Sequence, residues 1–139
     1  MILQMENLFL ALADKTRLRI LNLMREDEIC VYFFTEVLGE SQPKISRHLA
    51  YLKNAGIVSA RREGKWIHYQ IEAPESLFAA KILQDTLDWL KSQNDMRSDY
   101  EKLISICYSA KAPTIINSDA LIETRKSFEK RDELEIHLL

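Results

Sequence analysis

The sequence predicts a dimeric, mainly α-helical winged helix-turn-helix with a small β-hairpin. Three observations predict this fold: two helix-forming segments meet at a short turn around Gly39, the second segment has a polar outer face, and a hairpin pattern follows directly. The length of 139 residues suits one domain with a modest core. We expect this domain to span residues 1–110. Residues 111–139 are expected to form an extension, either mobile or holding a short helix within 118–134.

The first two helices follow from apolar spacing. Met5, Leu8, Phe9 and Leu12 recur at the spacing of one helical face. Asp14 is a suitable N-cap for the next helix, which has the sequence DKTRLRILNLMRE. In this helix Leu18, Leu21 and Met24 form an apolar stripe that is expected to face the core.

The segment from Ile29 to Gly39, ICVYFFTEVLG, is short and almost entirely apolar. Its β-branched and aromatic residues suit a buried strand, but we favour a short buried helix that stops at Gly39. Ser41 then caps a helix that runs to Gly56, with Pro43 in its first turn. Its buried face is expected to consist of Ile45, Leu49 and Leu52.

The outer face of this second helix carries side chains that can hydrogen-bond to base edges or phosphates. Residues 41–70 contain six basic residues and one acidic residue, a net charge of +5 in a chain whose net charge is −2. Clustered cations favour a polyanion such as DNA, although a solvated surface helix would have a similar composition. The candidate DNA-binding residues on the helix are Gln42, Lys44, Ser46, Arg47 and His48, the last being equally compatible with a structural role.

A β-hairpin is predicted directly after this helix. Residues 57–62 and 65–71 alternate as strands do, and Glu63-Gly64 is the expected tight turn. A hairpin in this position is a wing, and its tip charges Arg61, Arg62 and Lys65 are the further candidate DNA contacts.

Two more helices are expected, at about 75–93 and 99–110. The first is apolar over a wide arc that includes Phe78, Ile82 and Trp89, which suggests a partner subunit, with ordinary core packing as the alternative. On the second, Cys107 shares an apolar face with Leu103.

The composition argues against several classes of protein. Apolar runs fall short of the ~20 residues that cross a bilayer, and two cysteines are too few for a disulfide scaffold. Phosphate loops, metal-protease motifs and nucleophile elbows are also missing from the sequence. We therefore expect a cytoplasmic protein without membrane partners and without enzymatic activity.

Four segments in order carry a specific resemblance: LADKTRLRIL, EICVYFFTEVLG, SQPKISRHLAYLKNAGIV and REGKWIHYQI. Together they resemble the ArsR/SmtB family of winged-helix repressors over residues 5 to 110, and its arsenic-responsive branch in particular. The resemblance implies a homodimer paired through its first and last helices that binds an inverted-repeat operator in double-stranded DNA. It also implies that an inducer, a trivalent arsenical or antimonite, releases the DNA.

The sequence departs from the family at the sensing site. Arsenic-responsive members commonly carry ELCVCDL, where this chain has EICVYFF, so Cys30 keeps the first thiol position while Tyr32 replaces the second. A zinc-type site on the helix at 75–93 is not expected, because Asp85 and Asp88 have no histidine beside them.

Three interpretations of Cys30 and Cys107 stay open. They bind a trivalent arsenical through two thiolates, they form a redox pair, or they are inert buried residues. The leading hypothesis is a repressor with an arsenical inducer. The alternatives are a redox-responsive repressor and a winged-helix module for protein–protein contact without operator binding.

Overall fold

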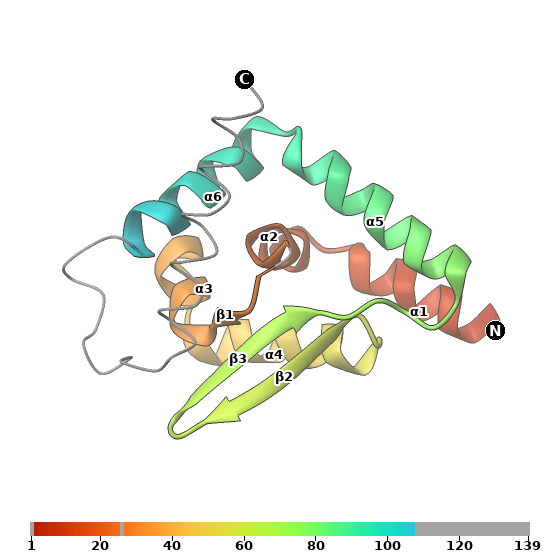
Figure 1. Cartoon of the computed structure of the whole chain (residues 1–139), viewed down its shortest axis with the longest axis horizontal. Helices are drawn as coiled ribbons and strands as arrows, with labels where there is room; N and C mark the ends of the chain where they lie inside the picture. Colours follow the sequence, from red (N-terminus) through yellow and green to blue (C-terminus); the bar gives the residue numbers. More distant parts are fainter. Residues whose placement is uncertain (1, 26, 108–139) are drawn as a thin grey trace.

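The computed structural model describes residues 2–25 and 27–107 of the 139-residue chain. The predicted extension at 111–139, with its helix at 118–134, lies outside these residues. In chain order the elements are α1 (Ile2–Leu12), α2 (Lys15–Met24), β1 (Ile29–Cys30), α3 (Val31–Leu38), α4 (Gln42–Asn54), β2 (Val58–Glu63), β3 (Trp66–Ile71), α5 (Leu77–Lys91) and α6 (Asn94–Cys107). The predicted winged helix-turn-helix is confirmed, with α2 in the middle of the molecule and the hairpin at one edge (Figure 1).

The helix boundaries around the turn follow the predicted capping signals. The Asp14 carboxylate accepts a hydrogen bond from the backbone N–H of Arg17 at 3.0 Å and starts α2. Gly39 ends α3 with φ +66°, the left-handed conformation that glycine adopts without strain. The Ser41 hydroxyl accepts from the N–H of Lys44 at 3.4 Å, and α4 begins at the next residue.

The core lies between α2, α3, α4 and the inner sides of α5 and α6. Phe33 and Phe34 of α3 are buried against it, as are the three apolar α4 residues that the sequence indicated. These α4 residues are Ile45, Leu49 and Leu52, each with no exposed surface. Their burial turns the opposite face of α4 away from the core.

The segment 29–39 contains both of the structures considered for it. Ile29 and Cys30 form a two-residue strand, and the favoured helix follows at Val31. This strand adds to the hairpin to give a three-stranded antiparallel sheet in the order β1-β3-β2. Apolar composition cannot separate strand from helix, and here pairing with β3 decided it.

The predicted hairpin turn is wrong by one residue. Glu63 pairs with Trp66 and ends β2, so the two turn residues are Gly64 and Lys65. Gly64 has φ +60°, as the first position of a tight two-residue hairpin turn requires. We refer to residues 58–71, the two strands with this turn, as the wing.

The last helix begins earlier than predicted, at Asn94 instead of residue 99. Its first turn is polar, so an apolar pattern could not locate it. Met96 is the apolar residue of this turn and is buried, and its carbonyl oxygen accepts a hydrogen bond from the side-chain amide of buried Asn22 at 2.8 Å. No helix within the described residues is long and apolar enough to cross a membrane.

Candidate nucleic-acid interface and inducer site

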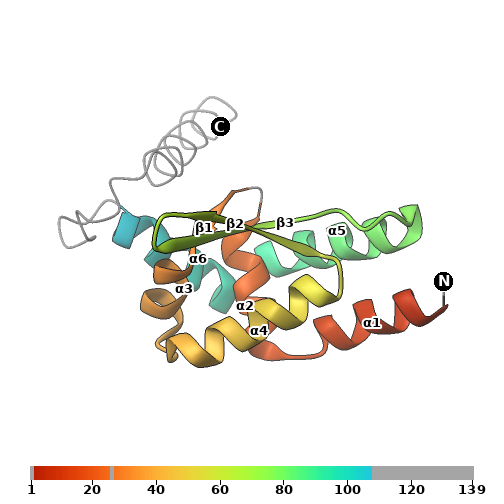
Figure 2. The same cartoon turned by 90° about the horizontal axis from the view of Figure 1, so that it is seen from below.

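Helix α4 and the wing lie on the same side of the molecule, away from α5 and α6 (Figures 1 and 2). The α4 side chains opposite its buried face point to solvent: Gln42 and Arg47 are exposed, and Lys44 and Ser46 are partly exposed. Four of the five predicted α4 contacts therefore share an accessible surface near the start of this helix. Direct contact between α4 and β2 sets the wing beside it.

Lys44 forms an ion pair with Glu40 one turn earlier, with 3.0 Å between Nζ and Oε1. Both side chains are about one-third exposed, and a surface pair of this kind contributes at most ~1 kcal/mol. The pair therefore leaves the lysine available to a phosphate.

His48 lies apart from the other four candidates. Its Nδ1 is 3.4 Å from Arg17 Nη1 and 3.9 Å from the Asp14 carboxylate. Burial lowers the pKa of His48, and the nearby cations, Arg17 among them, lower it further against the opposing effect of Asp14. A neutral ring held at the α2–α4 contact favours the structural role over base contact.

Arg17 was not singled out from the sequence, although it fixes the position of α4. Its guanidinium donates to the carbonyl oxygens of Ala11 at 2.8 Å and Leu10 at 2.9 Å, which lie at the end of α1. The same group stacks over the Tyr51 ring of α4 at 4.2 Å. A basic residue just after a helix N-cap, directly following another helix, is the sequence signal that was available.

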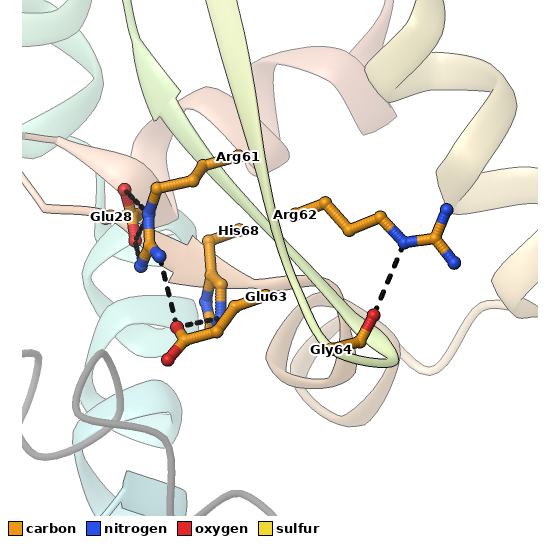
Figure 3. A network of polar contacts seen from close by, with 6 residues as sticks. All are labelled: Glu28, Arg61, Arg62, Glu63, Gly64 and His68. Atoms are coloured by element: carbon orange, nitrogen blue, oxygen red, sulfur yellow. Dashed lines mark hydrogen bonds and ion pairs between the residues drawn. The ribbon is translucent and has the colours of Figure 1, made fainter.

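The three predicted wing residues, Arg61, Arg62 and Lys65, are all exposed. The two arginines differ in their partners (Figure 3). Arg62 Nε donates a hydrogen bond of 3.3 Å to the carbonyl oxygen of Gly64. Arg61 instead directs its guanidinium to the carboxylates of Glu28 and Glu63.

Cys30 lies at the junction of β1 and α3 and is only 2% exposed. Burial raises the pKa of its thiol, while the backbone N–H groups of Tyr32 and Val31 at the start of α3 oppose this effect. Cys107, at the end of α6, is fully buried. The helices that begin and end at these residues, α3 and α6, are in contact.

Tyr32 occupies the position where arsenic-responsive members of the resembled family commonly have a second thiol, and it packs against the wing. Its ring meets Phe33 edge-on at 5.3 Å and Trp66 edge-on at 6.5 Å between centroids. The carboxylates of α5 have protein partners: Asp85 pairs with Lys81, and Asp88 accepts a hydrogen bond from Gln84. Within residues 2–25 and 27–107, no three histidine, cysteine or acidic side chains are placed to hold a metal ion.

A second surface is apolar. On α5, Leu77, Phe78 and Trp89 are 85%, 78% and 58% exposed, while Leu83, Leu87 and Leu90 on the other side are buried. Helix α1 contributes three further exposed apolar side chains: Ile2, Phe9 and Leu10. The wide apolar arc predicted for α5 thus serves core packing on one side and leaves an uncovered face on the other.

Known proteins resemble this chain in sequence and structure. The family described as "Bacterial regulatory protein, arsR family" matches residues 14–60. The arsenical resistance operon repressor of Escherichia coli (strain K12) is 47% identical over 79 residues, which cover 56% of this chain and 68% of that protein. The transcriptional repressor SdpR of Bacillus subtilis (strain 168) is 33% identical over 97 residues, covering 66% of this chain and all of that protein. HlyU from Vibrio cholerae N16961 has a similar structure, with a TM-score of 0.55 and 29% identity over 65% of this chain and 94% of that one.

Proposed function

Because the chain belongs to the arsR family of bacterial regulatory proteins, we propose that it is a cytoplasmic repressor that binds an operator in double-stranded DNA. One observation carries the proposal: α4 and the wing, which both carry exposed polar or basic residues, lie on one side of the molecule (Figure 2). The N-terminal part of the second helix is the part that reads base edges in helix-turn-helix proteins.

The proposed contacts divide by chemistry. Arg47 and Gln42 have the side chains that form two-point hydrogen bonds with guanine and adenine, so we assign them to base edges. Lys44, Ser46, Arg62 and Lys65 are assigned to phosphates, which set the position of the protein on the duplex without reading its sequence. The local charge of +5 supplies the attraction that an acidic chain as a whole lacks.

A homodimer fits the apolar surface of α1 and α5. Burying Phe78, Leu77 and Trp89 against a second copy would remove large apolar side chains from water at roughly 25 cal/mol per Å². A two-fold dimer reads an inverted repeat, because each copy presents the same α4 to one half-site. The half-site centres are then expected about 34–36 Å apart, one turn of DNA.

We propose a trivalent arsenical or antimonite as the inducer. The support is the pair of buried cysteines, Cys30 at the start of α3 and Cys107 at the end of α6, on helices that contact each other, together with the similarity to an arsenical resistance operon repressor. Two thiolates suit an organoarsenical, whose third valence is filled by carbon. Tyr32 in place of a thiol argues against a local three-thiolate site.

Salt-dependent operator binding tests the proposed function. The chain is titrated against its own promoter DNA and against a scrambled duplex at several salt concentrations. We expect preference for the promoter DNA and an affinity that falls linearly on a logarithmic salt scale. Binding that shows no dependence on salt or sequence would favour the protein–protein contact module instead.

A further inference from the structure

We infer that Arg61 positions the wing on the segment that carries Cys30, instead of contacting DNA. The inference rests on the proposed function, because it concerns how the wing is held for operator binding and how a ligand at Cys30 would affect the wing. Arg61 is one of three wing cations that the sequence alone presents as equivalent. The structure separates it from Arg62 by its side of the sheet and by its partners.

The strand register places Arg61 and Arg62 on opposite faces of the sheet. Arg61 lies opposite His68, whereas Arg62 lies opposite Ile67. Because residues that face each other across antiparallel strands share a face of the sheet, Arg61 and His68 are on one side and Arg62 is on the other. His68 in turn lies opposite Cys30 on β1. Arg61, His68 and Cys30 therefore form one row across the three strands.

The partners of Arg61 are two carboxylates from different parts of the chain (Figure 3). Its Nε is 3.2 Å and 3.3 Å from the two carboxylate oxygens of Glu28, and its Nη2 is 2.5 Å from one of them. Its Nη1 also donates to Glu63 at 3.1 Å. These contacts raise the pKa of Arg61, chiefly through Glu28. One cation held by two anions has a net charge of −1, which does not attract a phosphate.

Glu28 joins the wing to the connection between α2 and β1, because Arg61 lies 33 residues further along the chain. A second contact lies on the other side of Cys30, where the ring of Tyr32 packs edge-on against Trp66. Glu28 and Tyr32 are two residues before and two residues after Cys30. The first and last residues of the segment 28–32 thus both contact the wing, and Cys30 in the middle of the segment pairs with His68 of the wing.

This arrangement gives a ligand at Cys30 a direct effect on the wing. Cys30 is only 2% exposed, so a group attached to its sulfur needs space that β1 or α3 must provide by moving. Movement of either element pulls on Glu28 or Tyr32, and through them on Arg61 or Trp66. The wing then shifts relative to α4, and the contacts of Arg62 and Lys65 with DNA are lost together.

Two conservative variants separate positioning from phosphate contact: Glu28→Gln and Arg61→Gln. If Arg61 positions the wing, each variant weakens operator binding by about three- to tenfold with an unchanged salt slope, and the double variant is no weaker than either one. The direction of the change in operator affinity for Glu28→Gln is diagnostic. If electrostatic repulsion alone mattered, removing an acid beside the DNA would strengthen binding. Tighter binding by Glu28→Gln, with a salt slope reduced by about one in Arg61→Gln, would overturn the inference.

The matched control is Arg62→Gln, the neighbouring arginine on the opposite face. As a phosphate contact it is expected to lower both the affinity and the salt slope. Circular dichroism melts of all variants verify that each is folded at the assay temperature. Absence of salt-dependent binding in the unsubstituted chain is a failure of the proposed function, and it is seen before any variant is compared.

The link from Cys30 to the wing is also tested by fluorescence. In a Trp89→Phe background, Trp66 is the remaining tryptophan, so its emission reports on the contact with Tyr32. Because Trp89 lies on the proposed dimer surface, the mass and operator affinity of this background are first compared with those of the unsubstituted chain. Phenylarsine oxide is expected to shift this emission, and Cys30→Ser is expected to abolish the shift. Unchanged emission under conditions where phenylarsine oxide still releases the operator would show that the signal does not pass through the wing.

Discussion

Arg19 of α2 and Asp99 of α6 form a two-point ion pair, with Nε–Oδ2 and Nη2–Oδ1 distances of 2.7 and 3.0 Å. Their side chains are 26% and 14% exposed, and 80 residues separate them in the sequence. The planar guanidinium and carboxylate match in this geometry, which is stronger than a single-point contact. The pair fixes the helix that ends at Cys107 to the centre of the domain.

Asp99→Asn is therefore expected to lower the free energy of unfolding by ~1–3 kcal/mol, because it leaves a partly buried guanidinium without its charged partner. Asp85→Asn is the matched control, since Asp85 pairs with Lys81 where both side chains are more than 60% exposed. Urea denaturation should show a change of at most ~0.5 kcal/mol for the control. Equal effects of the two substitutions would contradict a special role for the Arg19–Asp99 pair.

Arg47→Ala is expected to weaken operator binding by ~1–3 kcal/mol and to relax the sequence preference at one base pair. Lys65→Ala, at the wing turn, should weaken binding to all sequences alike and lower the salt slope by about one. Fluorescence anisotropy with single-base operator variants distinguishes the two patterns. An unchanged affinity for Arg47→Ala would mean that α4 faces the DNA with a different side.

Phe78→Glu is expected to convert the dimer to a monomer and to reduce operator affinity strongly, because a charge would be buried in the apolar face of α5. Phe78 is 78% exposed in the single chain, so the fold of the monomer should be retained. Light scattering with size-exclusion chromatography measures the mass. Ser105→Glu, at an exposed position on α6, is the control and should leave the mass unchanged. A dimeric Phe78→Glu protein would place the interface elsewhere.

Cys30→Ser and Cys107→Ser are each expected to abolish release of the operator by phenylarsine oxide while leaving DNA binding intact. Both thiols are buried at elements that contact each other, and a dithiolate adduct needs both. Release in the presence of a mild oxidant, lost in the same variants, would support the redox-responsive alternative. If both serine variants still respond to phenylarsine oxide, cysteine-based arsenical sensing is excluded.

Acid is expected to destabilise the protein partly through His68. Burial lowers the pKa of this side chain, only 2% exposed, below its ordinary value of 6.5, and the carboxylates of Glu28 and Glu63 offset only part of the effect. As the pH falls through about 6.5, the unfolded chain takes up a proton here and the folded chain does not. The free energy of unfolding is therefore highest above that pH and decreases below it, until the pH reaches the lower pKa of His68 in the folded chain.

Comparing urea midpoints at pH 7.5 and 5.5 tests this expectation. His68→Gln should show a smaller decrease than the unsubstituted chain. His48→Gln should also reduce the decrease, but by less, since its side chain is 18% exposed against 2% for His68. A decrease of the same size in His68→Gln and in the unsubstituted protein would assign the acid sensitivity to other groups.

Local sequence signals located most of the fold. Asp14, Gly39 and Ser41 act over three or four residues, and each ends or begins a helix where it was expected to. The outcomes that the sequence pattern did not decide have different causes. The strand at Ile29–Cys30 exists because it pairs with Tyr69 and His68 of β3, 38 to 40 residues later in the chain. The hairpin turn is set by the local pairing of Glu63 with Trp66, and the start of α6 was missed because its first turn is polar.

The sequence by itself determined the winged helix-turn-helix, the basic segment from Ser41 to Gln70, and the replacement of a thiol by Tyr32, because these depend on residue type and short spacing. Only the tertiary structure distinguished Arg61 from Arg62 and showed that His48 contacts Arg17. It also showed that Cys30 lies opposite His68 in the sheet. These relations depend on which side of a strand or helix meets which neighbour. Side chains one residue apart in a strand point in opposite directions, so adjacent arginines of identical chemistry reach entirely different partners.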